Sequence, residues 1–337
     1  MPFIGIIRGF GEGYYATGYI IKIIKALNRR FRSKLKFEEI ALGNYLLFGC
    51  EMQDEEIVKL RECDAVFSGD LNGDNPIDYS IADIAMALDN CIEYTCISGL
   101  SDYGNVNVNI ASYFDGGTKL RYNTYNIDGC SETRVCSTHT AMNIVKHVSR
   151  ECERRRRRLA FVYDSDNEYC ANLFYKKFED FTLPLPNFHM IKFSLTDITY
   201  EILFEPGQFD TIFASKSFSD YAWGMYRFIL NEKFTAYTKY AKSKSLYYVK
   251  GLYSNSSLAD EVPSMCSYIV AFSEMLKNEF GMNKEAEHLR LALDNVLKTG
   301  KSVSETGNFV AAIIEELDKP VERRHSKFNK GKRYIIK

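Results

Sequence analysis

Short apolar runs alternate with amphipathic helical patterns along most of the chain. Residues 2–7 form an apolar run long enough for one buried strand, and residues 8–13 follow it with glycine at every second position. The next segment places apolar side chains on one face at helical spacing, at Ile20, Ile23, Ile24 and Leu27. A buried strand, a glycine turn and a helix make the opening unit of an α/β domain.

The same alternation continues through the later segments. It predicts strands at 34–42, 64–69, 91–98, 105–113, 159–163, 187–193 and 210–214. It predicts helices at 54–63, 78–88, 139–158, 168–181, 216–230, 284–299 and 306–317, and a further helix that opens at Pro263. Residues 121–127 and 132–136 are expected to form a hairpin around Asp128-Gly129. Strands that alternate with helices predict a largely parallel sheet.

The glycine turn admits two interpretations. Glycine lets backbone N–H groups approach a phosphate at a helix N-terminus, and Glu38 and Glu39 supply acids near the second strand. The dinucleotide fingerprint is G-x-G-x-x-G, however, whereas this turn reads G-x-G-x-G. We therefore favour a tight strand-to-helix turn that needs positive φ.

Composition and charge narrow the function classes. The 337 residues are 46% hydrophobic and 26% charged, as in ordinary soluble proteins, and no apolar run reaches the ~18 residues that span a membrane. The net charge of −1 argues against a protein whose main surface binds nucleic acid.

Two segments are locally basic. Arginines 154–158 suggest a nucleic-acid-binding patch, but we favour a solvated helix end. Residues 321–337 hold seven Lys or Arg against Glu322 alone, which predicts a solvated basic tail.

Cysteine and histidine spacing gives no metal motif. The nine cysteines include no C-x-x-C pair, and the five histidines include no H-E-x-x-H motif. An odd number of cysteines scattered through apolar segments predicts reduced thiols in an intracellular protein. With no targeting segment ahead of the first strand, we expect a cytoplasmic location, or the mitochondrial matrix if such a segment has been removed.

The order of segments from about residue 3 to about residue 318 resembles the metal-dependent β-decarboxylating dehydrogenases, which include isocitrate and isopropylmalate dehydrogenases. The matching segments are the strand, glycine turn and helix at the start, 64–73, 209–220, 263–281 and 299–307. The last of these, with Thr299-Gly300-Lys301-Ser302-Val303, looks most like the NAD-dependent isocitrate branch. The resemblance implies a two-lobed α/β fold with discontinuous domains and helices on both faces of a mostly parallel sheet.

The resemblance also implies domain bounds and assembly. One lobe, on the cofactor side, would comprise 1–99 and 232–320. The other would comprise 100–231 and carry a dimer clasp arm at about 113–136, and 321–337 would form the basic tail. The implied partner is a second copy or a related subunit. We expect no membrane association, and the net charge disfavours nucleic acid as a partner.

The family's chemistry uses Mg²⁺ or Mn²⁺ held by aspartates, a lysine and a tyrosine that move protons, arginines that clamp carboxylates, and NAD. By resemblance, the metal aspartates fall on Asp220, Gly224 and Thr196, with Asp197 adjacent. The lysine falls on Ser165 and the tyrosine near Lys119, unless a gap brings in Tyr122. Asn167 keeps its substrate-side place. The arginines fall on Tyr79, Asp89 and Ser112, and the cofactor positions on Gly73, Lys250, Gly251 and Asn255.

Compared with the family, this sequence has similar residues at the positions that shape the fold. At most of the positions where the family has a charged residue for catalysis, it has a different residue. This pattern favours a non-catalytic member of the family, acting as a regulatory or partner subunit or as a binding protein, to which NAD and Mg²⁺ or Mn²⁺ come by family resemblance only. The alternative is an active NAD-dependent oxidoreductase with a changed substrate. A nucleic-acid-binding protein that uses the basic segments is a further alternative.

Overall fold

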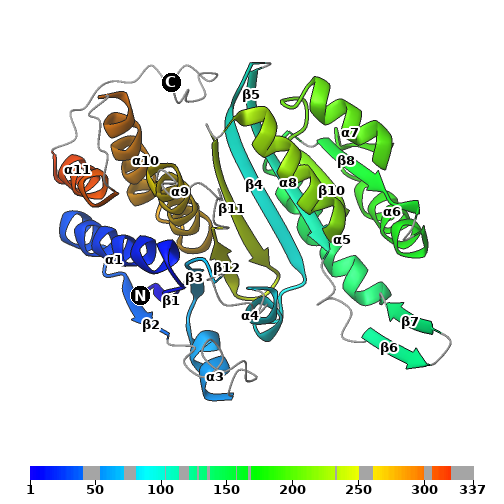
Figure 1. Ribbon diagram of the computed structural model, residues 1–337, viewed down its shortest axis with the longest axis horizontal. Coiled ribbons are helices and arrows are strands. Elements are labelled where there is room, and N and C mark those ends of the chain that lie inside the picture. The colour runs from blue at the N-terminus through cyan, green and yellow to red at the C-terminus, as the bar shows by residue number, and fades with distance from the viewer. Residues whose placement is uncertain are drawn as a thin grey trace.

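The structure is a computed structural model, and Figure 1 shows its ribbon. It describes residues 1–40, 54–71, 81–102, 104–113, 121–126, 129–134, 137–156, 158–165, 168–231, 234–249, 261–299 and 306–319. The strands are β1 (Phe3–Ile7), β2 (Lys36–Glu39), β3 (Ala65–Ser68), β4 (Ile92–Ser101), β5 (Gly104–Tyr113), β6 (Arg121–Asn126), β7 (Gly129–Arg134), β8 (Arg158–Tyr163), β9 (His189–Ser194), β10 (Thr211–Ser215), β11 (Phe234–Ala241) and β12 (Ser245–Tyr248). The helices are α1 (Glu12–Phe31), α3 (Asp54–Glu62), α4 (Ile81–Ala87), α5 (Thr138–Glu153), α6 (Glu168–Thr182), α7 (Leu195–Phe204), α8 (Lys216–Leu230), α9 (Glu261–Phe280), α10 (Asn283–Lys298) and α11 (Thr306–Asp318).

One ten-stranded sheet runs through the protein in the order β2-β1-β3-β12-β11-β4-β5-β10-β8-β9. Among the described strands, six of the nine pairings in this sheet are parallel. The antiparallel pairings all involve β4 or β11 at its centre. The C-terminal strands β11 and β12 thus lie between β3 and β4, which are consecutive strands in the chain.

Helices cover both faces of the sheet. On one face, α1, α9, α10 and α11 pack over β1 and β3, and α5 and α6 pack over β8 and β10. On the other face, α3 and α4 cover one end of the sheet, and α7 and α8 cover the other. The predicted fold class, α/β with a mostly parallel sheet and helices on both faces, is confirmed. The lobe bounds 1–99 with 232–320, and 100–231, stay a prediction.

Several local predictions need correction. The helix predicted at 139–158 ends at Glu153. Beyond that end, the Arg155 guanidinium donates to the Asn107 carbonyl at 2.5 Å, and the Arg156 N–H donates to Asp210 Oδ2 at 2.7 Å. These contacts with β5 and the start of β10 turn the chain toward β8. The helix predicted to open at Pro263 begins two residues earlier, at Glu261.

The hairpin prediction is confirmed, with its second arm at Gly129–Arg134 rather than 132–136. Three elements were not predicted, namely α7, β11 and β12. The helices in the described parts of the chain include none that is long and apolar enough to cross a membrane. The predicted basic tail 321–337 lies outside the described residues.

Candidate functional site

A strip of buried polar side chains crosses the centre of the sheet on the face that α8 covers. Tyr240 on β11 lies opposite Glu93 on β4, and Glu93 lies opposite Ser112 on β5. Residues that pair across neighbouring strands project from the same face, so these three side chains are neighbours. The next row toward the sheet centre carries Thr238 opposite Thr95. All five residues are buried, between the apolar core under α4 and the core under α8.

Lys216 is the first residue of α8 and reaches into this strip. Its Nζ donates to Glu93 Oε1 at 2.7 Å and to Asp220 Oδ1, one helical turn farther on, at 2.8 Å. The Glu93 side chain is 3% exposed, whereas Lys216 and Asp220 are 38% and 50% exposed. Burial works to lower the pKa of Lys216, but the Glu93 and Asp220 carboxylates outweigh it and raise that pKa. The ammonium is therefore charged at any physiological pH.

The strip holds polar atoms that lack partners. Glu93 Oε2 and Ser112 Oγ are buried, and neither has a hydrogen-bond partner among the residues that the structure describes. Burial, followed by the negative charge of Glu93, raises the pKa of Tyr240 well above its usual value. The phenol therefore stays protonated beside the carboxylate, and the described strip carries two carboxylates, Glu93 and Asp220, against the single ammonium of Lys216.

The glycine turn lies against the loop after β3. Gly9 and Gly11 have φ of 72° and 48°, so the turn does need positive φ. A Cβ on Gly13 would come within 2.3 Å of Asp70 N. The Phe10 N–H donates to the Asp70 carbonyl at 2.7 Å. This close packing of α1 on Asp70 accounts for the glycines without a bound phosphate.

Asp70 links the glycine turn to the centre of the sheet. Tyr248 Oη at the end of β12 donates to Asp70 Oδ1 at 2.9 Å. The Asp70 N–H donates to Tyr268 Oη on α9 at 3.1 Å. Of the acids near the second strand, Glu39 forms an ion pair with Arg8 at 3.0 Å. These contacts are structural links between elements, and sequence reasoning did not anticipate them.

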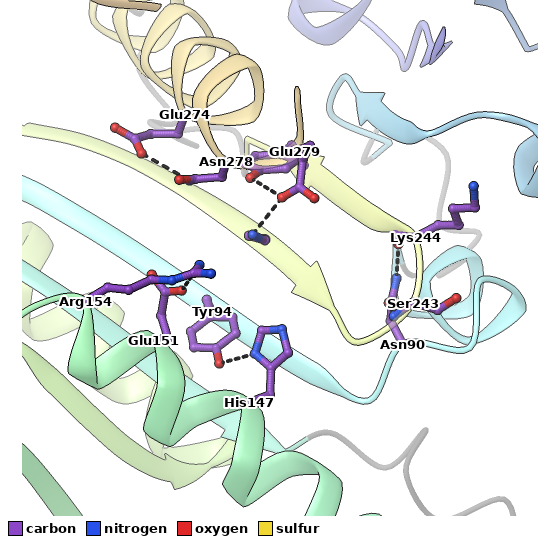
Figure 2. A network of polar contacts seen from close by, with 12 residues as sticks. Asn90, Tyr94, His147, Glu151, Arg154, Ser243, Lys244, Glu274, Asn278 and Glu279 are labelled. Carbon is purple, nitrogen blue, oxygen red and sulfur yellow. Dashed lines mark hydrogen bonds and ion pairs between the residues drawn. The ribbon is translucent and has the colours of Figure 1, made fainter. Parts of the chain in front are cut away.

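The opposite face of the same central strands carries a second polar network, drawn in Figure 2. Tyr94 Oη on β4 lies 2.8 Å from His147 Nδ1 on α5. Burial lowers the pKa of His147, so this imidazole is neutral at pH 7. From the other side, Glu279 on α9 accepts from Tyr247 Oη at 2.9 Å and from Lys239 Nζ at 2.8 Å. The network ties α5 and α9 to the sheet through paired groups.

The structure brings two of the sequence-predicted positions together. Lys216 binds both Asp220 and Glu93, and Glu93 lies opposite Ser112 on the neighbouring strand. Sequence reasoning missed Lys216 and Glu93. Gly224 is exposed, and a Cβ there would meet nothing within 4 Å. The pattern Lys-x-x-x-Asp at the start of a predicted helix was the available signal for the ion pair.

The other sequence-predicted site residues that the structure describes lie away from the strip and from Lys216. Asp197, in the first turn of α7, accepts from its own cap residue Ser194 at 2.7 Å, and Thr196 is exposed beside it. Asp89 has φ of 58° and pairs with Arg61 at 3.7 Å. Ser165 is exposed after β8. Outside the described residues lie Gly73, Tyr79, Lys119, Asn167, Lys250, Gly251 and Asn255, and the Tyr122 side chain is likewise not described.

The cluster does not fit a divalent metal ion. Asp220, to which the resemblance assigns a metal aspartate, already bonds an ammonium, and the Gly224 side chain offers no ligand atom. Within the described ranges, no group of three or more His, Cys, Asp or Glu side chains could hold a metal ion. Mg²⁺ needs near-octahedral oxygen coordination, which two carboxylates already engaged by a lysine do not supply.

Comparisons with known proteins identify the fold. No protein-family model matches the chain, and no curated protein sequence matches it. Solved structures do match. An isocitrate dehydrogenase from Methylococcus capsulatus superposes with a TM-score of 0.76 at 16% identity, over 95% of this chain and 100% of that chain.

Two further solved structures agree. A protein from Thermus thermophilus gives a TM-score of 0.77 at 14% identity, over 94% of this chain and 68% of that chain. A β-decarboxylating dehydrogenase from Thermococcus kodakarensis, in its apo form, gives a TM-score of 0.73 at 15% identity, over 94% of this chain and 96% of that chain. The chain therefore has an isocitrate/isopropylmalate dehydrogenase-like fold.

Proposed function

We propose that this chain is a non-catalytic relative of isocitrate and isopropylmalate dehydrogenases that acts as a regulatory or partner subunit, or as a binding protein. The supporting observation is the buried carboxylate of Glu93 directly opposite Ser112, the position to which the family resemblance assigns a substrate-clamping arginine. A substrate with two or more carboxylates would find no guanidinium there, and the carboxylates of Glu93 and Asp220 outnumber the single ammonium of Lys216. Like charges in a poorly solvated site repel strongly.

The remaining substitutions support the same proposal. Ser165 cannot supply the proton-transfer function of a lysine, because a serine hydroxyl does not titrate in the accessible pH range. NAD and Mg²⁺ or Mn²⁺ come to this chain by family resemblance only. Nucleic-acid binding by arginines 154–158 gains no support, because Arg154 pairs with Glu151 at 3.3 Å and Arg155 binds Asn107.

The isolated chain should not oxidise isocitrate or isopropylmalate. With NAD, Mn²⁺ and millimolar substrate, we expect turnover below about 0.01 s⁻¹, since loss of one proton-transfer group alone slows a reaction by about 10²–10⁴-fold. The measurement is the absorbance of reduced nicotinamide. Gly224→Asp and Ser112→Arg, each made alone, should stay inactive, because the other gaps remain.

Turnover above about 1 s⁻¹, within the ordinary enzyme range, would refute the proposal and support an active oxidoreductase with this fold. Calorimetric titration with NAD, NADP and ATP, with and without Mn²⁺, would show separately whether a nucleotide binds. A saturable nucleotide signal without turnover is the behaviour expected of a regulatory subunit.

We also propose that the chain forms a homodimer through α7 and α8, extending the predicted role of the arm at about 113–136. These two helices contact each other, and they expose five large apolar side chains, Tyr200, Leu203, Phe204, Tyr221 and Phe228. Phe228 alone is 84% exposed. Exposed apolar side chains concentrated on neighbouring helices are typical of an interface, and an obligate dimer buries on the order of 2,000 Å² or more.

Light scattering at micromolar concentration should give twice the mass of one chain. The double variant Tyr221→Asp/Phe228→Asp should be monomeric, because two charges cannot be buried unpaired in an apolar interface. Tyr169→Asp, at an equally exposed position on α6, should leave the dimer intact. A monomeric parent chain, or a dimer unaffected by the double variant, would contradict this interface.

A further inference from the structure

We propose that Lys216 is a built-in cation that takes the place of a divalent metal ion in this site, with Glu93 and Asp220 as its carboxylate partners. The inference goes beyond the absence of catalysis, because a chain without dehydrogenase activity can still bind a metal. It rests on the two ion pairs that join α8 to the centre of the sheet, at 2.7 and 2.8 Å.

The burial of Glu93 requires a cation. Its side chain is 3% exposed, and an isolated carboxylate at that depth would be strongly disfavoured. Lys216 supplies the compensating charge through its 2.7 Å contact with Glu93 Oε1. A divalent ion bound to the same carboxylate oxygens would lie beside the ammonium, where repulsion opposes its entry.

The local geometry explains how one lysine serves both carboxylates. Lys216 and Asp220 are four residues apart on α8, so their side chains leave the same side of the helix. Both carboxylate oxygens contact the same Nζ atom, at 2.7 and 2.8 Å, so they converge on one point as oxygens around a metal ion do. The Lys216 ammonium thus occupies the position between the two carboxylates that a metal ion bound to both would need.

A second observation is that the Glu93 carboxylate does not use all of its hydrogen-bonding capacity. Glu93 Oε2 is buried without a hydrogen-bond partner among the described residues. Ser112, directly opposite, is small and fully buried, and its Oγ likewise lacks a described partner. Removal of the ammonium would therefore leave Glu93 Oε2, and the part of Oε1 that Lys216 had bound, available to another cation.

The test is a direct titration with Mn²⁺, followed by the electron paramagnetic resonance signal of the free ion. The parent chain should show no saturable site up to about 1 mM. Lys216→Met, which keeps the apolar stem and removes the charge, should gain one site per chain that binds at least about tenfold more tightly than the parent does. Adding Asp220→Asn or Glu93→Gln to Lys216→Met should abolish that site.

Lys239→Met is the matched control. Lys239 pairs with one carboxylate, Glu279, on the opposite face of the same strands, so its loss should create no Mn²⁺ site. Lys216→Gln is a second variant for the case that Lys216→Met does not fold, because an amide keeps hydrogen-bond donors near both carboxylates without the charge. It should also gain Mn²⁺ binding.

Two results would overturn the proposal. One is a saturable Mn²⁺ site in the parent chain that Asp220→Asn removes. The other is a folded Lys216→Met or Lys216→Gln variant, judged by circular dichroism, that binds Mn²⁺ no better than the parent does. Either result would leave the predicted lack of turnover standing, since that prediction is measured by nicotinamide reduction and depends on the missing arginines and lysine.

Discussion

Gly13→Ala should destabilise the protein by about 3 kcal/mol or more, at the upper end of what overpacking costs. The added Cβ would lie 2.3 Å from Asp70 N and 2.8 Å from Asp70 O. Both are backbone atoms, so no side-chain rotation can relieve the contact. The loop after β3 would have to move, which strains the Phe10–Asp70 and Tyr248–Asp70 hydrogen bonds at 2.7 and 2.9 Å.

Urea denaturation followed by circular dichroism measures the free energy of unfolding of both this variant and its control. Gly224→Ala is the control, because it makes the same chemical change at an exposed position of α8 where the Cβ meets nothing within 4 Å. It should be neutral or stabilise the helix by up to about 1 kcal/mol, the difference in helix propensity. Equal stabilities for the two variants would show that α1 does not pack on Asp70 as described.

Phe213→Ala should cost about 3–5 kcal/mol, the usual range for deletion of a buried aromatic ring. Phe213 on β10 is 1% exposed, and its ring centroid lies 4.9, 5.1 and 5.6 Å from those of Phe178, Phe174 and Phe161. The alanine variant would leave a cavity lined by three rigid rings, which cannot collapse to fill it. The melting temperature should therefore fall by several degrees.

The control for Phe213→Ala is Tyr169→Ala on α6. Tyr169 is 92% exposed, so its loss should change stability by less than about 0.5 kcal/mol. Phe213→Leu should fall between the two, since leucine refills part of the volume. A Phe213→Ala variant as stable as the parent would mean that this aromatic cluster is not the core that holds α5 and α6 to the sheet.

Much of the fold could be predicted because its signals are local. Ile20, Ile23 and Leu27 recur at helical spacing, and all three are buried in α1. The glycine turn was correctly interpreted as a tight turn, since the alternation of glycines does not fit a phosphate-binding loop and Gly9 and Gly11 have positive φ. Strand β10 was predicted from the short apolar run Ile212-Phe213-Ala214, and all five of its residues are buried.

The missed elements lack such signals. β11 has the sequence Phe-Thr-Ala-Tyr-Thr-Lys-Tyr-Ala, in which threonine, lysine and tyrosine alternate with no clear apolar face. It is nevertheless mostly buried, because it lies between β12 and β4 at the centre of a sheet that helices cover on both faces. The arginines at 154–156 extended the helical pattern of α5, but their contacts with Asn107 and Asp210, on distant segments of the chain, end the helix.

By itself, the sequence determined the order of most strands and helices, the α/β class and the resemblance to the dehydrogenases. Only the tertiary structure decided that Asp220 is bound by Lys216, that Glu93 is buried beside both, and that a Cβ on Gly13 would collide with Asp70. The physical reason is distance along the chain. Helical periodicity depends on residues within a turn or two, whereas the Lys216–Glu93 ion pair joins residues 123 positions apart and exists only once α8 packs on β4.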